Sequence, residues 1–445
     1  MDLKRLQFYI SNHIGQQQEQ IREGKRYYAN KTDILNEGIV PKENKDDPLR
    51  NADNRINHNF HQVLVDEKTS YLFTYPVMIN LGDDTLEEKV NDILGDEWNK
   101  TLKELCVEAS NTGVAWLHYW IESEDNKNVF NYACMNTEEI IPIYSEGIKK
   151  ELEQLIRYYN VQELTEQNTF INYAIIEYWN KEEYIYYKLK DSFNSNNVVE
   201  KIEFAHSFKQ VPYIEFDNNT LKQGDLNKYK KLIDLYDRVT SGFANDLEDI
   251  QQIIYILQGY GGEDPEEFMR DIKRFKMIKA EAEGGAVSTL QIDIPVEARK
   301  VLLEQLKKQI FESGQGLQQD IESVGNASGV TLKFFYRKLE LKAGLLETEF
   351  RTAINKLIRV ILDTMFNIQE QVKIVQTWTR NAIQNNLENT QIAQQSYGIL
   401  PLEIILRNHP WVEDIEEAKE LIKQQEQEQM FDNDYANLGA MTNEE

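Results

Sequence analysis

The sequence has 445 residues and carries 75 Asp and Glu against 49 Lys and Arg, a formal net charge of −26. That length indicates about two to four packed units, and 41% hydrophobic residues can form a sizeable core. The acidic excess argues against a protein that grips nucleic acid tightly by neutralising phosphates.

Three further features concern the compartment in which the protein works. Only two cysteines occur, Cys106 and Cys134, far apart and without a CxxC pair, so neither a disulfide framework nor a cysteine zinc site is predicted and a reducing compartment fits best. The N-terminus lacks the pattern of a signal peptide. No stretch approaches the roughly 18 apolar residues of a membrane span, so we expect a soluble protein without a membrane partner.

The N-terminal third predicts helices. The first 30 residues show helical apolar spacing and lead into a turn-rich stretch around Pro48. A second helix should end before Pro76, with a short strand after it, and residues 86–112 again have a helical pattern.

From Val114 to about Phe216 the pattern changes to short runs rich in β-branched and aromatic residues, such as 114–120, 174–179 and 184–189. These runs, separated by polar turns, predict an antiparallel β region. Their tyrosines could stack bases, but no basic residues interleave with them, and partly exposed sheet aromatics are the better interpretation.

The most regular pattern follows residue 225. Apolar positions three and four apart predict a long helix that Gly259 ends, with one stripe available for packing against other helices. Its positions are Leu226, Tyr229, Ile233, Tyr236, Thr240, Phe243, Leu247, Ile250, Ile254 and Leu257, of which only Thr240 is polar. Residues 263–295 then form a small insertion with a helix, a turn at Gly284-Gly285 and a strand-like run at 287–292.

A second long helix is predicted from about Val296 to Phe311 or beyond, followed by a small, polar, flexible stretch at 320–329. An amphipathic helix of about 35 residues should begin near Val330. The remainder predicts polar helices around Pro401 and Pro410, helical structure to about Met430 and a frayed end. Residues 411–445 carry 11 acidic and two basic residues.

No motif indicates an enzyme. The sequence contains no P-loop and no GxGxxG between a strand and a helix. His58 and His61 lie three apart with Asp66 nearby, a weak hypothesis for a metal-dependent hydrolase, since a zinc site needs a further ligand at recognisable spacing. We therefore predict no catalytic residues, no cofactor and no metal.

The order of these segments resembles the portal proteins of tailed bacteriophages, in the family typical of long-tailed phages of Gram-positive hosts. The resemblance covers nearly the whole chain. The residues that carry it are Tyr27-Tyr28 with Asp33-Ile34, residues 54–60 through Lys68, Tyr71-Leu72 and Pro76-Val77, and residues 325–330 opening the long helix.

The resemblance implies an α+β fold, mainly helical, with the wing, stem, clip and crown of a phage portal. The implied parts are the wing at 1–225, stem helix 1 at 226–258, the clip at 259–295, stem helix 2 at 296–318, the tunnel loop at 319–329, the long wing helix at 330–368, and the crown with an acidic tail at 369–445.

The resemblance also implies a function: a ring of about twelve copies at one capsid vertex, the channel through which the genome is packaged and ejected. The implied partners are the large terminase, a head–tail adaptor, the major capsid and scaffolding proteins, and double-stranded DNA. The implied location is the virion, with the host cytoplasm during assembly.

Two groups of residues are candidates for this role. The channel or tunnel-loop candidates are Ser323, Gly325, Asn326, Ser328, Gly329, Lys307, Lys308 and Lys333. The candidates for packing between subunits are Tyr236, Phe243, Leu247, Ile250 and Ile254.

The net charge agrees with passing a polyanion without holding it, because phosphate contacts would add affinity and slow sliding. The main alternative is an intracellular helical scaffold or adaptor that assembles through the same stripes but never meets DNA. An open bore would discriminate the two.

Overall fold

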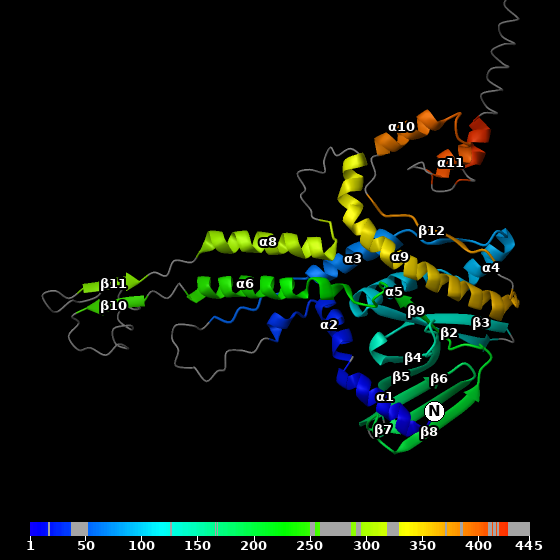
Figure 1. Ribbon diagram of the computed structural model, residues 1–445, viewed down its shortest axis with the longest axis horizontal. Helices are drawn as coiled ribbons and strands as arrows, with labels where there is room; N and C mark the ends of the chain where they lie inside the picture. The colour runs from blue at the N-terminus through cyan, green and yellow to red at the C-terminus, as the bar shows by residue number, and fades with distance from the viewer. Residues whose placement is uncertain are drawn as a thin grey trace, which may run out of the picture. The chain divides into compact units, whose positions relative to one another are not determined.

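The computed structural model describes most of the chain. The described residues are 1–16, 18–36, 52–124, 127–164, 166, 168–249, 254–258, 286–290, 295–317, 329–369, 372–382, 386–407, 412, 415 and 418–425. The chain divides into two compact units, one made of Met1–Gln318 with Lys338–Asn381 and the other of Gln319–Arg337 with Ala382–Glu445. Figure 1 shows the elements of both.

Helices begin the first unit, as the sequence predicts. The predicted N-terminal helix forms as two elements, α1 (Leu3–Gln16) and α2 (Gln18–Tyr28), followed by the short η1 (Asp33–Leu35). Helix α3 (Phe60–Phe73) ends before Pro76 and strand β1 (Met78–Asn80) follows, which confirms that prediction.

The helical stretch predicted at 86–112 is interrupted. Helix α4 (Asp84–Leu94) ends at Gly95, whose φ of 63° favours glycine, and α5 (Trp98–Thr112) follows. The Asp83 carboxylate caps α4 by accepting hydrogen bonds from the amides of Thr85 at 3.0 Å and Leu86 at 3.2 Å.

The predicted antiparallel β region is confirmed and forms two sheets. One has the order β3-β2-β9, with β2 (Val114–Glu124), β3 (Lys127–Met135) and β9 (Tyr213–Asp217). The other is a meander after η3 (Thr137–Glu139), with β4 (Ile140–Tyr144), β5 (Leu152–Leu164), β6 (Phe170–Trp179), β7 (Glu183–Lys190) and β8 (Val198–Ala205) in chain order.

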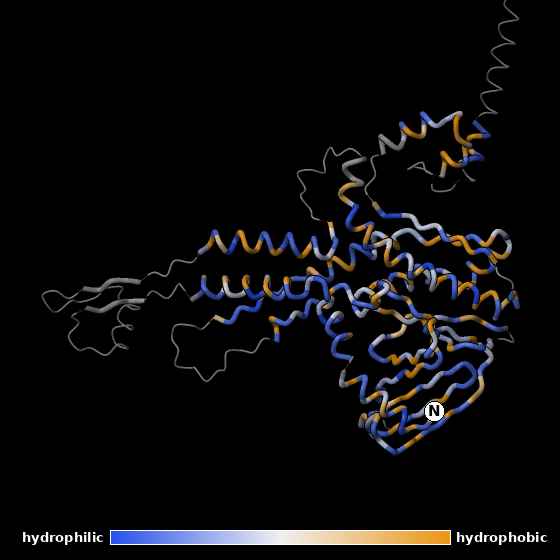
Figure 2. The backbone as a smooth tube through the Cα atoms, viewed as in Figure 1, coloured by the Kyte–Doolittle hydropathy of each residue, from blue (hydrophilic) through white to orange (hydrophobic). Residues whose placement is uncertain are grey.

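The meander is covered on one face and joined to the smaller sheet on the other. Its alternating side chains Ile156, Tyr158 and Ile176 pack with Leu6 and Ile10 of α1. A second cluster connects the two sheets; its buried members are Trp116, Ile140, Leu155, Trp179, Val211 and Tyr213. The resulting mixture of apolar and polar positions along the strands can be followed in Figure 2.

The tyrosines on the other face of the meander have partners within the sheet. The guanidinium of Arg157 lies 4.2 Å from the ring centre of Tyr159, whose hydroxyl donates to Glu177 at 3.0 Å. The Lys188 ammonium lies 4.3 Å from the ring centre of Tyr173. These contacts favour sheet aromatics over a base-stacking surface.

The first stem-like helix is shorter than predicted. After η4 (Asp225–Lys228), α6 runs from Lys230 to Asp249, whereas Ile254–Gln258 is strand β10, paired antiparallel with β11 (Ala286–Leu290). The prediction of helix through Leu257 is therefore wrong. The run Ile253–Leu257 is β-branched and aromatic, and strand preference outweighs a spacing that also suits a helix. The predicted helix after residue 263 and the turn at 284–285 lie outside the described residues.

Two later helices agree with prediction. Helix α8 (Val296–Gly314) corresponds to the second long helix, and α9 (Gly329–Phe366) to the long amphipathic one. The buried stripe of α9 consists of Leu339, Ala343, Leu346, Phe350, Ile354, Leu357 and Ile361.

Short elements complete the described chain. Strand β12 (Val375–Thr377) pairs with β1 in the first unit. In the second unit, α10 (Asn386–Ser396) and α11 (Leu402–Arg407) flank Pro401, and residues 418–425 are helical.

Close packing of α2 on α5 yields a first prediction. A β-carbon on Gly24 would lie 1.9 Å from the carbonyl oxygen of Asn111, so Gly24→Ala must push the helices apart and should destabilise the fold by about 1–3 kcal/mol. Gly15→Ala in α1 is the matched control, because no atom lies within 4 Å of its β-carbon position and alanine favours helix. Thermal unfolding should show a lower Tm for the first variant only; equal Tm values would contradict the prediction.

Candidate functional site

The most regular feature of the first unit is the antiparallel pair α6 and α8, which lie side by side (Figure 1). Arg299 of α8 forms an ion pair with Asp246, and its guanidinium lies 5.4 Å from the ring centre of Phe243. Ile233 of α6 and Ile310 of α8 belong to one buried apolar cluster, and Leu232, Leu302 and Leu306 line a groove of about 450 Å³ between the helices. The pair is thus held together by apolar and charged contacts.

Charged side chains fix the start of α6 to the N-terminal elements. The Lys230 ammonium lies 2.5 Å from Asp33 and 2.9 Å from Asp234, and the Tyr27 hydroxyl also donates to Asp234. Burial and the hydrogen bond to Asp234 raise the pKa of Tyr27, so the phenol stays protonated.

One turn further along α6, buried Asp237 receives two contacts. The Thr32 hydroxyl donates to it at 2.7 Å, and Nδ1 of His58 lies 2.8 Å from it. A residue at the start of η1 and one from the approach to α3 thereby hold α6 at a defined position.

A second, fully buried ionic cluster lies where α3, η4, α8 and α9 meet. The Asp225 carboxylate accepts from the Lys68 ammonium at 2.7 Å and lies 3.0 Å from the Lys342 ammonium. Asn218 bonds both Lys68 and Asp225, at 2.8 Å and 3.0 Å. The side chains of all three charged residues are at most 4% exposed.

The pKa values of this cluster follow from burial and charge. Burial alone would raise the pKa of Asp225, but the two ammonium groups and the hydrogen bonds hold it well below its usual range. Burial lowers the pKa of Lys342 to about 8. The cluster therefore holds one carboxylate between two lysines, an excess of one positive charge at neutral pH.

The predicted channel residues fall in different places. Lys307 and Lys308 are exposed on α8, and Gly329 is the first residue of α9, whose first turns also include Lys333. Ser323, Gly325, Asn326 and Ser328 lie outside the described residues.

The residues predicted for subunit packing do not form one exposed stripe. Tyr236 packs on His58 and Phe60 of the same chain, with ring centres 4.7 and 5.0 Å away, and Phe243 contacts Arg299. Leu247 is 49% exposed, Ile254 lies in strand β10, and Ile250 is outside the described residues.

The structure does not bring His58, His61 and Asp66 together as ligands. His58 contacts Asp237, while His61 lies 2.7 Å from the Tyr229 hydroxyl and 3.0 Å from the Asn111 amide oxygen. Tyr28 donates to Asp66 at 2.7 Å. Within the described ranges, no group of three or more His, Cys, Asp or Glu side chains could hold a metal ion.

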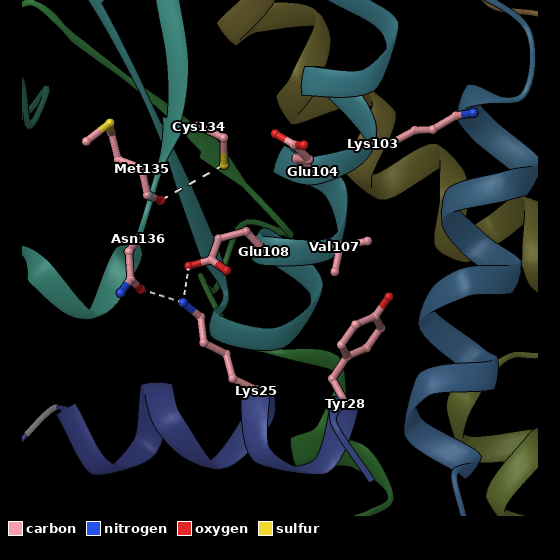
Figure 3. A pocket seen from close by; sticks show the side chains of 9 residues that line it. All are labelled: Lys25, Tyr28, Lys103, Glu104, Val107, Glu108, Cys134, Met135 and Asn136. Atoms are coloured by element: carbon pink, nitrogen blue, oxygen red, sulfur yellow. Dashed lines mark hydrogen bonds and ion pairs between the residues drawn. The ribbon is translucent and has the colours of Figure 1, made fainter.

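An open pocket of about 500 Å³ lies between α2, α5 and β3 (Figure 3). The Lys25 ammonium in it lies 2.7 Å from Glu108 and 2.5 Å from the Asn136 side-chain oxygen. Burial raises the pKa of the Cys134 thiol to about 12, so this cysteine is not a nucleophile at neutral pH. The pocket offers no catalytic arrangement.

Comparison with known proteins identifies the family. The family model described as phage portal protein, SPP1 Gp6-like, matches residues 7–430. The chain belongs to the phage portal protein family. The portal protein of Clostridium phage phiCD119 is 52% identical over 451 aligned positions, covering 98% of this chain and all of the relative. The portal protein of Bacillus phage SPP1 is 30% identical, covering 92% of this chain and 84% of the relative.

Solved structures include more distant matches. A chain in the virion of a native gene transfer agent particle has a TM-score of 0.44 and 11% identity, covering 80% of this chain and 91% of that one. A chain from the neck of the native particle, computed with C12 symmetry, has the same TM-score and identity, covering 78% and 88%.

Two predictions made above concern catalysis and membrane spans. Portal proteins are structural components of the virion rather than enzymes, which confirms the prediction drawn from the missing motifs. Among the described helices, none combines the length and apolar character required to cross a membrane.

Proposed function

We propose that this chain assembles into a ring at a single capsid vertex, where the ring conducts double-stranded DNA into and out of the capsid. The observation that carries the proposal is the match to the portal family over residues 7–430, which includes the helix pair and the long helix. The proposed partners are further copies of the chain, the large terminase, a head–tail adaptor, and the capsid and scaffolding proteins.

The parts of a portal map onto the chain with one revision. The proposed wing is 1–225, the stem helices are α6 and α8, the long wing helix is α9, and the crown and tail are 369–445. Since α6 ends at Asp249, we assign the β10–β11 pair to the clip together with 259–285. The tunnel loop remains proposed for 319–329.

The charge of the chain supports a conduit rather than a DNA-binding site. Each copy contributes a formal charge of −26, and a ring multiplies it, so a passing duplex meets overall repulsion with contacts restricted to a few cations. Lys307 and Lys308 point about 100° apart on α8 because they are consecutive helical residues. Lys308 lies on the face that we assign below to contacts between copies. We therefore propose Lys307 for the channel, together with Lys333 at the start of α9.

We propose that neighbouring copies meet through two exposed rows on the helix pair. The basic row of α6 is Lys231, Leu235 and Arg238, and the acidic row of α8 is Glu297, Val301 and Glu304. Within each row the residues are four and three positions apart, so they share one face of the helix. The middle residue of each row is apolar and exposed: the side chain of Leu235 is 38% exposed and that of Val301 is 49% exposed. Lys308 lies on the same face one turn beyond the acidic row.

Two unlike faces suit a ring. In a closed head-to-tail ring, one face of each copy contacts a different face of the next copy. Exposed Leu247 can extend this contact. Tyr236 and Phe243 already have partners inside the chain, so we propose that they shape the helix pair instead.

Deletion of residues 319–328 tests the channel directly. We expect rings of normal size, because the proposed contacts lie on α6 and α8, but at least a tenfold loss of packaged DNA in a complementation assay. Packaged DNA would be quantified per assembled capsid by nuclease protection. Normal packaging, or failure to form rings, would contradict the assignment of the tunnel loop.

A further inference from the structure

The chain leaves α8 through a tightly fixed backbone. Gln315 ends the helix with a φ of 56°, in the left-handed region. Gly314 and Gly316 lie so close to α3 that a β-carbon on either would come within 2.5 Å of a Leu64 methyl group. A larger residue at either position would therefore require Leu64 to move, which shows that the exit from α8 is packed closely against α3.

Two oppositely charged side chains hold this exit. The Lys342 ammonium of α9 donates to the Gly314 carbonyl oxygen at 3.0 Å, and the Glu67 carboxylate of α3 accepts from the Leu317 amide at 3.0 Å. The amide of Gly316, between them, donates to the carbonyl oxygen of Phe311 at 3.0 Å. A carbonyl and an amide that would otherwise lack helical partners are thus satisfied from two different helices.

The charge balance of the buried cluster makes Lys342 unusual. Lys68 alone would neutralise Asp225, and both are already bonded to Asn218. A second buried ammonium exceeds the charge that Asp225 can neutralise, which is costly in a protein interior, and the carboxylate that offsets part of it is Glu67 at the exit of α8. Lys68 and Lys342 both contact Asp225. What distinguishes Lys342 is its hydrogen bond to the carbonyl oxygen of Gly314.

We propose that Lys342 and Glu67 form an exit clamp that fixes where the chain leaves α8, and that Lys342 thereby couples α9 to the end of α8. This inference rests on the proposed function in one respect: if residues 319–329 are the channel loop, the exit clamp positions that loop. Lys342 is then a positioning residue for DNA passage and touches no DNA itself.

The two lysines provide a matched test. Lys342→Met and Lys68→Met each remove one buried ammonium beside Asp225 and leave a neutral lysine–aspartate pair, so both should fold. Hydrogen exchange by mass spectrometry would follow the amides of Gly316 and Leu317 in the full-length protein. We expect exchange at these amides to rise at least tenfold in Lys342→Met and to change less than threefold in Lys68→Met.

Glu67→Ala gives a second route that leaves the buried cluster intact. It should accelerate exchange at Leu317 at least tenfold, because it removes the acceptor of that amide from a half-buried position. If Lys342→Met fails to fold, this variant decides the question alone.

Equal acceleration in both lysine variants, or unchanged exchange at Leu317 in Glu67→Ala, would overturn the exit clamp. These readouts require no DNA, so they separate failure of the exit clamp from failure of the portal role. Where wild-type rings package DNA, Lys342→Met should form rings normally yet package at least tenfold less DNA than Lys68→Met.

Discussion

Reversing the charges of one exposed row should abolish the ring, and reversing both rows in the same chain should restore it. In Lys231→Glu/Arg238→Glu, the formerly basic row of α6 would face the acidic row of its neighbour. Like charges across an interface cost several kcal/mol, and every contact in a closed ring is affected equally. We expect mainly monomers by native mass spectrometry at concentrations where the unaltered chain forms rings.

Glu297→Lys/Glu304→Lys should have the same effect through α8, whereas the chain with all four reversals again presents unlike rows and should form rings. Lys149→Glu/Lys150→Glu is the matched control, because it changes the charge of the chain by the same amount as Lys231→Glu/Arg238→Glu, at an exposed turn outside α6 and α8. Loss of rings in this control, or rings that persist in both single-row variants, would refute the proposed contact.

Asp225→Asn should cause the largest loss of stability. The change preserves size and leaves Lys68 and Lys342 buried without a counter-charge, a situation that costs about 3–5 kcal/mol. Equilibrium urea unfolding should show a lower midpoint with an unchanged slope. Asp96→Asn, at an exposed turn, is the control and should change stability by less than about 0.5 kcal/mol.

The double variant Asp225→Asn/Lys342→Met makes this prediction sharper. Removing one of the two unpaired lysines should recover part of the lost stability, so the two substitutions should not be additive. Additive losses would mean that Asp225 and Lys342 do not interact as the 3.0 Å distance implies.

The elements best predicted from the sequence are those in which the spacing of apolar residues fits only one type of secondary structure. Phe350, Ile354 and Leu357 repeat at helical spacing within α9, and that stripe is buried as expected. The β region was predictable because β-branched and aromatic residues concentrate in runs such as 184–189, which lies within β7.

Prediction failed where two patterns coincided. Ile254 and Leu257 continue the spacing of α6 and also belong to a run of β-branched and aromatic residues, and the structure forms β10 there. Spacing alone could not decide, because pairing with β11 is a contact with a strand about 30 residues away.

The predicted contact stripe remains a prediction, and the structure shows which of its residues already have partners within the chain. The spacing of Tyr236 and Phe243 correctly indicates a packed face, but His58, Phe60 and Arg299 of the same chain occupy it. A buried stripe on a helix does not reveal whether its partner belongs to the same copy or to the next.

The buried ionic cluster was missed entirely, although one signal was present. Lys342 lies between Leu339 and Leu346, three and four residues away on the apolar face of α9, where a charge needs a buried partner. The identity of that partner could not be inferred, because Asp225 is 117 residues away in the sequence and only the fold brings it to 3.0 Å.

The most direct test of the central claim is electron microscopy of the purified chain, with native mass spectrometry to count subunits. We expect closed rings of a single size with an open central bore, formed by the unaltered chain and by the chain with all four charge reversals. Closed dimers, or filaments without a bore, would contradict a portal ring and favour an assembling scaffold that never conducts DNA.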